Sequence, residues 1–222
     1  MKYVTIAETN QLIDRLRAQL PNRPLSYGEA LNLATDQAFR VRLWLNVSDS
    51  RINLAWLLQQ RAVPVMRVPR YKLGENTSGM TTDQVDGRLR MFINQNEPHV
   101  RQRFTLAHEL KHAIDFYVAN TLYARIGSGS SKRRAEQIEA ICNHFAACLL
   151  MPAGPFKSAW FRTQDIELVA NLFHVSQEAV STRIAVLGLR DKPHTTRRSY
   201  FRRAGWGSTP FEIDFAALNS RA

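Results

Sequence analysis

Two histidines and a glutamate in the stretch FTLAHELKHAIDF, residues 104–116, have the residue types and the spacing that metal-assisted hydrolysis requires. Residues four apart share a face of a helix, so His108 and His112 can direct two imidazole nitrogens at one zinc ion. Glu109 lies beside that ion, where its carboxylate can take a proton from a water that the ion polarises. The alternative is an ordinary amphipathic helix with scattered polar residues. Apolar neighbours argue against a fully solvated face, namely Leu106, Ala107, Leu110, Ala113 and Ile114.

A catalytic zinc ion needs a third protein ligand and one position that stays open for water. The segment EQIEAICNHFAACLLMP, residues 136–152, is predicted to be helical and offers three candidates. Glu139 is the best of them, and Glu136 competes with it from one turn earlier on nearly the same face. Cys142 is a chemically possible ligand, although a small buried hydrophobic residue is the interpretation that we favour. Asn143, one turn beyond Glu139, could orient one of the histidines through its amide.

The elements that must position these residues are predicted to form an α+β fold that is mostly helical. The strands come from a β-rich segment at 62–69 and from a hairpin at 78–95, which the turn pair Asp86-Gly87 and the alternating apolar residues after it indicate. Together they predict a small twisted sheet of three strands beside the helix of the two histidines. Helices are expected before the sheet over 7–20, 26–47 and 50–61, and after it from about Arg134 to Leu150.

The segment from Asp165 to Leu189 reads as a helix, a short turn and a second helix, with Ser176 able to cap the second helix. This length suits a helix-turn-helix, but the apolar residues on both helices favour packing against the rest of the chain. From Arg190 onward the chain is basic, aromatic and irregular, and we expect a tail. Arginines interleaved with aromatic rings suit nucleic acid or an acidic protein, and nucleic acid is the less favoured partner.

The composition fits a soluble globular protein in a reducing compartment. The 222 residues carry a formal net charge of +11 and no apolar run of membrane-spanning length, so we expect a cytoplasmic protein without a membrane partner. Cys142 and Cys148 lie six residues apart in a predicted helix and point in different directions, which argues against a disulfide. Three histidines have no partner pattern and are assigned no role: His99, His174 and His194.

The stretch RQRFTLAHELKH followed by EAICNHFAACLLMP resembles the ImmA/IrrE family of zinc metallopeptidases. That family shows an Arg-Phe-Thr-Leu-Ala-His-Glu-x-x-His helix and a second helix with Glu-x-x-Ala-Asn-x-Phe-Ala, which ends in Leu-Leu-Met-Pro. The resemblance covers residues 62–189 and implies a zincin-like fold. It also implies zinc bound by His108, His112 and Glu139, with Glu109 as general base, and it favours Glu139 over Glu136.

Two positions depart from the family pattern. Lys111 replaces a glycine, and Cys142 replaces an alanine. Neither is a predicted ligand, so both departures are compatible with catalysis. Lys111 is expected on the far side of the helix from Glu109, with its charge pointing to solvent.

Three parts of the chain follow from these observations: an N-terminal helical segment at 1–61, the metallopeptidase core at 62–189, including the helix-turn-helix-like pair, and the basic aromatic tail at 190–222. The resemblance implies a zinc-dependent endopeptidase whose substrate is a helix-turn-helix transcriptional repressor encoded nearby, in a stress response or in mobile-element or toxin-antitoxin regulation. The alternative is a non-proteolytic regulator or toxin-antitoxin component, which binds a repressor or nucleic acid through its basic surface. Glu109 separates the two, because a purely structural metal site has no use for a base beside an open position.

Overall fold

The computed structural model describes residues 11–48, 50–59 and 61–189 of the chain. The chain divides into two compact units, of which the first is Met1–Gly188 and the second Leu189–Ala222. Leu189 is the one residue of the second unit that is described, so the predicted basic tail lies outside the described residues.

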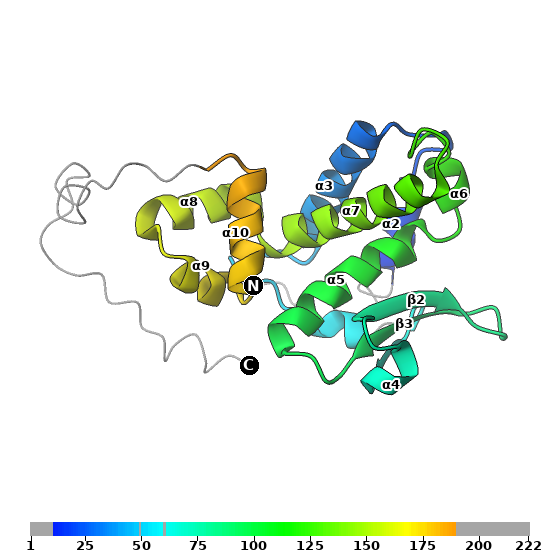
Figure 1. The fold of residues 1–222 in the computed structure, drawn as a ribbon, viewed down its shortest axis with the longest axis horizontal. Coiled ribbons are helices and arrows are strands. Elements are labelled where there is room, and N and C mark those ends of the chain that lie inside the picture. Colours follow the sequence, from blue (N-terminus) through cyan, green and yellow to red (C-terminus); the bar gives the residue numbers. More distant parts are fainter. Residues whose placement is uncertain (1–10, 49, 60, 190–222) are drawn as a thin grey trace, which may run out of the picture. The chain divides into compact units, whose positions relative to one another are not determined.

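Helices dominate the first unit, and a three-stranded sheet accompanies them, which confirms the predicted α+β class (Figure 1). Strand β3 (Leu89–Asn94) is central. It pairs in parallel with β1 (Val65–Val68) and antiparallel with β2 (Gly79–Asp83). The predicted hairpin is therefore present, and its turn contains Gly87 with a φ of 72°, a left-handed conformation that glycine adopts without strain. The alternation predicted for β3 is also found, because one set of side chains is buried: Leu89, Met91 and Ile93.

Helix α5 (His99–Asp115), which carries the two histidines, lies between the sheet and helix α7 (Ser131–Leu150) (Figure 1). Helix α3 (Tyr27–Trp44) packs on α7 as well. The apolar residues next to the histidines are buried, as the sequence predicts, and they form the core together with α7 and α3. Its buried members include Leu106, Ala107, Leu110, Ala113 and Ile114 from α5, Ile141, Phe145 and Leu149 from α7, and Ala34, Ala38 and Val41 from α3.

Local capping explains where several helices begin. Ser26 and Glu29 form a capping box at the start of α3, and the side chain of Ser130 accepts a hydrogen bond from the backbone of Arg133 at the start of α7. Ser176 caps the last helix as predicted. The remaining described helices are α2 (Leu12–Arg17), α4 (Arg70–Leu73), α6 (Ala119–Leu122), α8 (Ala153–Thr163), α9 (Ile166–Phe173) and α10 (Gln177–Val186).

Two buried arginines close the C-terminal end of α7, where the last carbonyl groups of a helix lack partners within it. Arg42 of α3 donates to the carbonyl of Leu149 at 3.0 Å, and Arg183 of α10 donates to the carbonyl of Met151 at 3.1 Å. Positive charge is favourable at this end of a helix because the helix dipole is negative there. Segments from both ends of the described chain therefore hold the helix that carries Glu139.

The helix pair α9 and α10 packs by its apolar residues, as favoured from the sequence. Val169 and Phe173 of α9 and Val180 of α10 are buried, and the rings of Phe173 and Phe156 lie 5.5 Å apart. Among the described residues, no helix is long and apolar enough to cross a membrane.

One predicted helix is wrong. Residues 50–61 were expected to form an α-helix, but the described residues of this segment form only the short 3-10 helix η1 (Ala55–Gln59). The side chain of Asn53 accepts a hydrogen bond from the backbone N–H of Ala55 at 2.8 Å, and such local bonds compete with helix formation.

Candidate metal centre

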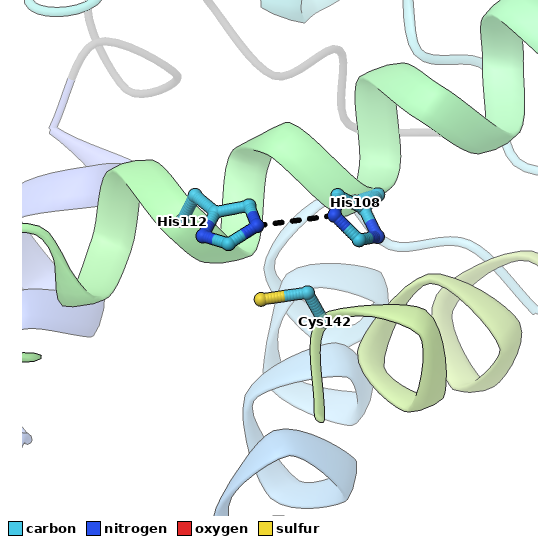
Figure 2. A group of neighbouring side chains, drawn as sticks. All are labelled: His108, His112 and Cys142. Carbon is cyan, nitrogen blue, oxygen red and sulfur yellow. Dashed lines mark hydrogen bonds between the residues drawn. The ribbon is translucent and has the colours of Figure 1, made fainter. Parts of the chain in front are cut away.

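His108 and His112 meet on one face of α5. Their Nε2 atoms lie 3.1 Å apart and their ring centroids 4.9 Å apart (Figure 2). The one-turn spacing on a helix produces this convergence, as predicted from the sequence. Both side chains are partly exposed, with 13% and 26% of their surface open to solvent, so a ligand can reach them.

Glu139 approaches the two imidazoles from α7. Its Oε2 lies 3.2 Å from Nε2 of His108, and its Oε1 lies 3.3 Å from Nε2 of His112. Hydrogen bonds with both histidines hold the pKa of Glu139 well below its usual value. Burial lowers the pKa of His108, but the carboxylates of Glu139 and Glu109 outweigh this effect and raise it.

The donor set has the chemistry and the spacing of a zinc site. A tetrahedral zinc ion with bonds of about 2.0 to 2.1 Å holds neighbouring donors about 3.3 Å apart. The Nε2 atoms of His108 and His112 lie 3.1 Å apart, and each has a different carboxylate oxygen of Glu139 within 3.3 Å. Two imidazole nitrogens and one carboxylate oxygen also leave one of four positions open, as catalytic zinc sites do.

Cys142 points from α7 toward the same two histidines (Figure 2). Its sulfur and the ligand nitrogens of His108 and His112 all lie within 4.8 Å of one another. The side chain is buried, as the favoured sequence interpretation requires. Burial, and after it the charge of Asp115, raises the pKa of the thiol well above its usual value.

Glu136, the competing candidate, is exposed. Within the described part of the chain, no ion pair or hydrogen bond joins it to either histidine. Asn143 lies where the sequence suggested, since its Oδ1 is 2.9 Å from Nδ1 of His108. An N–H donated from Nδ1 to this oxygen would leave Nε2 free to bind a metal.

Glu109 lies beside the histidines but is buried, with only 4% of its surface exposed. Burial raises the pKa of its carboxyl group. The hydroxyl of Thr81 on strand β2 donates to Oε2 of Glu109 at 2.7 Å, a contact that the sequence did not reveal. Strand β2 can approach this closely because Gly79 has no side chain: a Cβ there would lie 2.5 Å from the side chain of Thr105 and 3.0 Å from Oε1 of Glu109.

Lys111 is not exposed, which corrects the prediction that its charge points to solvent. Its side chain is fully buried, and Nζ lies 2.6 Å from Oδ2 of Asp115 and 2.8 Å from Oε1 of Gln37. The hydroxyl of Tyr123 donates to the same aspartate. The physical reason is that α5 is covered by protein on the face of Lys111, where a buried cation requires a paired carboxylate. The spacing of Lys111 and Asp115, one helical turn apart, is the signal in the sequence that could have revealed this pair.

A helical metal site of this form, beside a small sheet, is typical of metallopeptidases. The sequence profile of the IrrE N-terminal-like domain, the peptidase M78 family, matches residues 66–185, which is more than half of the chain. The protein therefore belongs to this peptidase family, as the resemblance suggested. No curated protein gave a significant match.

A solved structure of a transcriptional regulator of Mycobacterium tuberculosis has a similar fold, with a TM-score of 0.51. The two sequences are 17% identical, and the similarity covers 80% of this chain. It covers 52% of the regulator, so this chain spans about half of that protein's length.

Proposed function

We propose that the protein is a zinc-dependent endopeptidase in which His108, His112 and Glu139 hold the metal. The observation that supports this most directly is the convergence of the two Nε2 atoms, 3.1 Å apart, with a carboxylate oxygen of Glu139 3.2 to 3.3 Å from each, since a tetrahedral zinc ion holds its donors at about this spacing. Membership of a peptidase family supports the hydrolytic reaction.

A bound zinc ion would supply Lewis-acid chemistry, by polarising the peptide carbonyl group and increasing the acidity of the attacking water. Glu109 takes a proton from that water and delivers it to the leaving amine. Its burial favours this role, because a carboxylate with a raised pKa is a stronger base. Thr81 fixes the carboxylate, and Asn143 fixes the ring of His108.

The substrate is a protein, and strand β2 offers a way to bind it. In the described part of the chain, β2 pairs with β3 along one edge and with no strand along the other. An extended peptide can add to such an edge through main-chain hydrogen bonds. It would then pass the carboxylate of Glu109, because Thr81 belongs to the same strand.

The family resemblance supports a helix-turn-helix transcriptional repressor encoded nearby as the proposed substrate, cleaved in a stress response or in mobile-element regulation. The similarity to the mycobacterial regulator concerns the fold and does not bear on this choice.

Incubation of the zinc-loaded protein with a helix-turn-helix repressor from the neighbouring gene tests the proposal, with mass spectrometry to detect fragments. We expect defined fragments that are absent when zinc is chelated and absent with Glu109→Gln. Fragments that persist at equal yield with Glu109→Gln would contradict the proposed mechanism.

A further inference from the structure

A cavity of about 210 Å³ lies along α5 apart from the histidine pair. Its wall includes His99 and Arg103, which lie one turn apart near the start of the helix. Arg51 comes from the loop before η1, Arg67 from β1, and His174 from the residue that ends α9. His108 and His112 do not line this cavity.

The cavity concentrates positive charge. Three arginines and two histidines line it, and none of its described lining residues is acidic. Arg51, Arg67 and His99 form no ion pair or hydrogen bond with any other described residue. The guanidinium groups of Arg51 and Arg67 therefore have no counter-charge in the part of the chain that the structure describes.

Backbone carbonyl groups hold the side chain of Arg103 in place, but no carboxylate balances its charge in the described part of the chain. Its guanidinium group donates to the carbonyl of His174 at 3.2 Å and to the carbonyl of Ile52 at 3.0 Å, and neither acceptor is charged. Burial and then the charge of Arg51 lower the pKa of Arg103 to about 10. Burial, and after it Arg51 and Arg103, lowers the pKa of His174. Cations this close repel one another, and a bound anion would relieve the repulsion.

The volume of the cavity limits the size of the anion that it can hold. Pockets for drug-sized ligands range from about 300 to 1,000 Å³, so this one suits a smaller group. Arginine binds phosphate through two parallel hydrogen bonds, and a dianion balances several cations better than a carboxylate does. The N-terminus of α5 also lies at the cavity and has no side-chain cap, which favours negative charge there.

We propose that this cavity binds a phosphate group, either as free phosphate or as a phosphate monoester. Arg103 forms the fixed base of the site because backbone carbonyls hold it. Arg51 and Arg67 are exposed and can close on the phosphate oxygens. Leu58 and Leu106 add apolar surface to the wall of the cavity.

Isothermal titration of the full-length protein with inorganic phosphate, and separately with phosphoserine, tests this site. We expect the double variant Arg51→Ala with Arg67→Ala to bind at least about tenfold more weakly, since it loses the hydrogen bonds of two guanidinium groups to the phosphate. Tighter binding of phosphoserine than of phosphate would identify a monoester as the ligand, and the reverse order would identify the free anion. Serine serves as the uncharged control.

Two further variants test whether phosphate binding depends on this cavity, and not on net charge or on the proposed metal centre. Arg125→Ala with Arg162→Ala removes the same charge from exposed positions outside the cavity and should leave phosphate binding unchanged. His112→Ala disrupts the proposed metal centre and should also leave it unchanged, so the test does not depend on zinc or on peptidase activity. The proposal is overturned if the protein binds neither phosphate compound, if the Arg51 and Arg67 variant binds as tightly as the parent, or if His112→Ala abolishes binding.

Discussion

The hydroxyl of Thr81 donates to the carboxylate of Glu109 at 2.7 Å and so connects the edge strand β2 to the helix α5. The same hydroxyl lies 3.2 Å from the main-chain carbonyl oxygen of Glu109. The residue proposed as general base is thus held by the strand proposed to bind the substrate.

Replacing Thr81 by valine keeps the shape of the side chain and removes the hydroxyl. We expect kcat for cleavage to fall about ten- to a hundredfold with zinc content unchanged, because a hydrogen bond to a charged group contributes about 1.5–3 kcal/mol. Thr82→Val is the matched control, since among the described residues the hydroxyl of Thr82 donates only to the carbonyl of Asp83. Equal activity of the two variants would exclude a positioning role for Thr81.

Glu109→Gln preserves the size of the side chain but removes its ability to accept a proton. General-base catalysis contributes about two to four orders of magnitude, so cleavage should fall by that factor. Zinc content and thermal stability should stay close to those of the parent, because Glu109 is not a proposed ligand. Full biological activity of this variant in cells would favour the non-proteolytic regulator instead.

Zinc affinity should distinguish the candidate ligands on α7. Loss of a residue that orients a ligand weakens metal binding about 10–100-fold, which we expect for Asn143→Ala. Glu139→Ala should weaken it further, and Glu136→Ala and Cys142→Ala should leave it nearly unchanged. Competition with a chelator measures all four. If Cys142→Ala lost more zinc than Glu139→Ala, the thiol rather than the carboxylate would be the third ligand.

The buried pair of Lys111 and Asp115 should be sensitive to the loss of one partner. Lys111→Met leaves an unpaired carboxylate in the core, and we expect the free energy of unfolding to fall by about 3–5 kcal/mol. The exposed substitution Lys157→Met should change it by at most about 0.5 kcal/mol. Urea denaturation measures both. A change below 1 kcal/mol for Lys111→Met, on the order of surface substitutions, would mean that the pair is not maintained in solution.

Cys148 should ionise near neutral pH. Burial raises the pKa of its thiol, but the hydrogen bond with His144 and the charge of Arg183 outweigh it and lower the pKa to about 7. Because the folded pKa is below that of a free thiol, the thiolate stabilises the fold at high pH, and this contribution is lost as the pH falls through about 7. The ultraviolet absorbance of the thiolate should rise around this pH and should be missing from Cys148→Ser. A midpoint that Arg183→Met left unchanged would exclude the proposed charge effect.

The parts of the fold that depend on neighbouring residues were predictable. The turn at Gly87, the alternation along β3 and the one-turn spacing of His108 and His112 are local patterns, and the structure contains the elements that they predict. Glu139 lies on α7 and the two histidines on α5, so no spacing within one helix predicts that they meet. The family resemblance was needed to favour Glu139 over Glu136.

Contacts between distant segments were not predictable in this way. Thr81 reaches Glu109 only because Gly79 lets β2 approach α5. The phosphate cavity joins side chains from residues 51 to 174, and no spacing in the sequence relates them. Helix α8, which follows Pro152, is not among the helices predicted from the sequence.

The two arginines at the end of α7 have a consequence for how the protein can be divided. The family profile begins at residue 66, but Arg42, which binds the carbonyl of Leu149, belongs to α3 and precedes that boundary. An excised fragment of residues 66–185 would keep every proposed zinc ligand, yet it would lose the helix that covers α7 and leave this carbonyl without its partner. The proposed zinc ligands thus lie within residues 66–185, but the packing that holds their helices also requires α3, which precedes this segment.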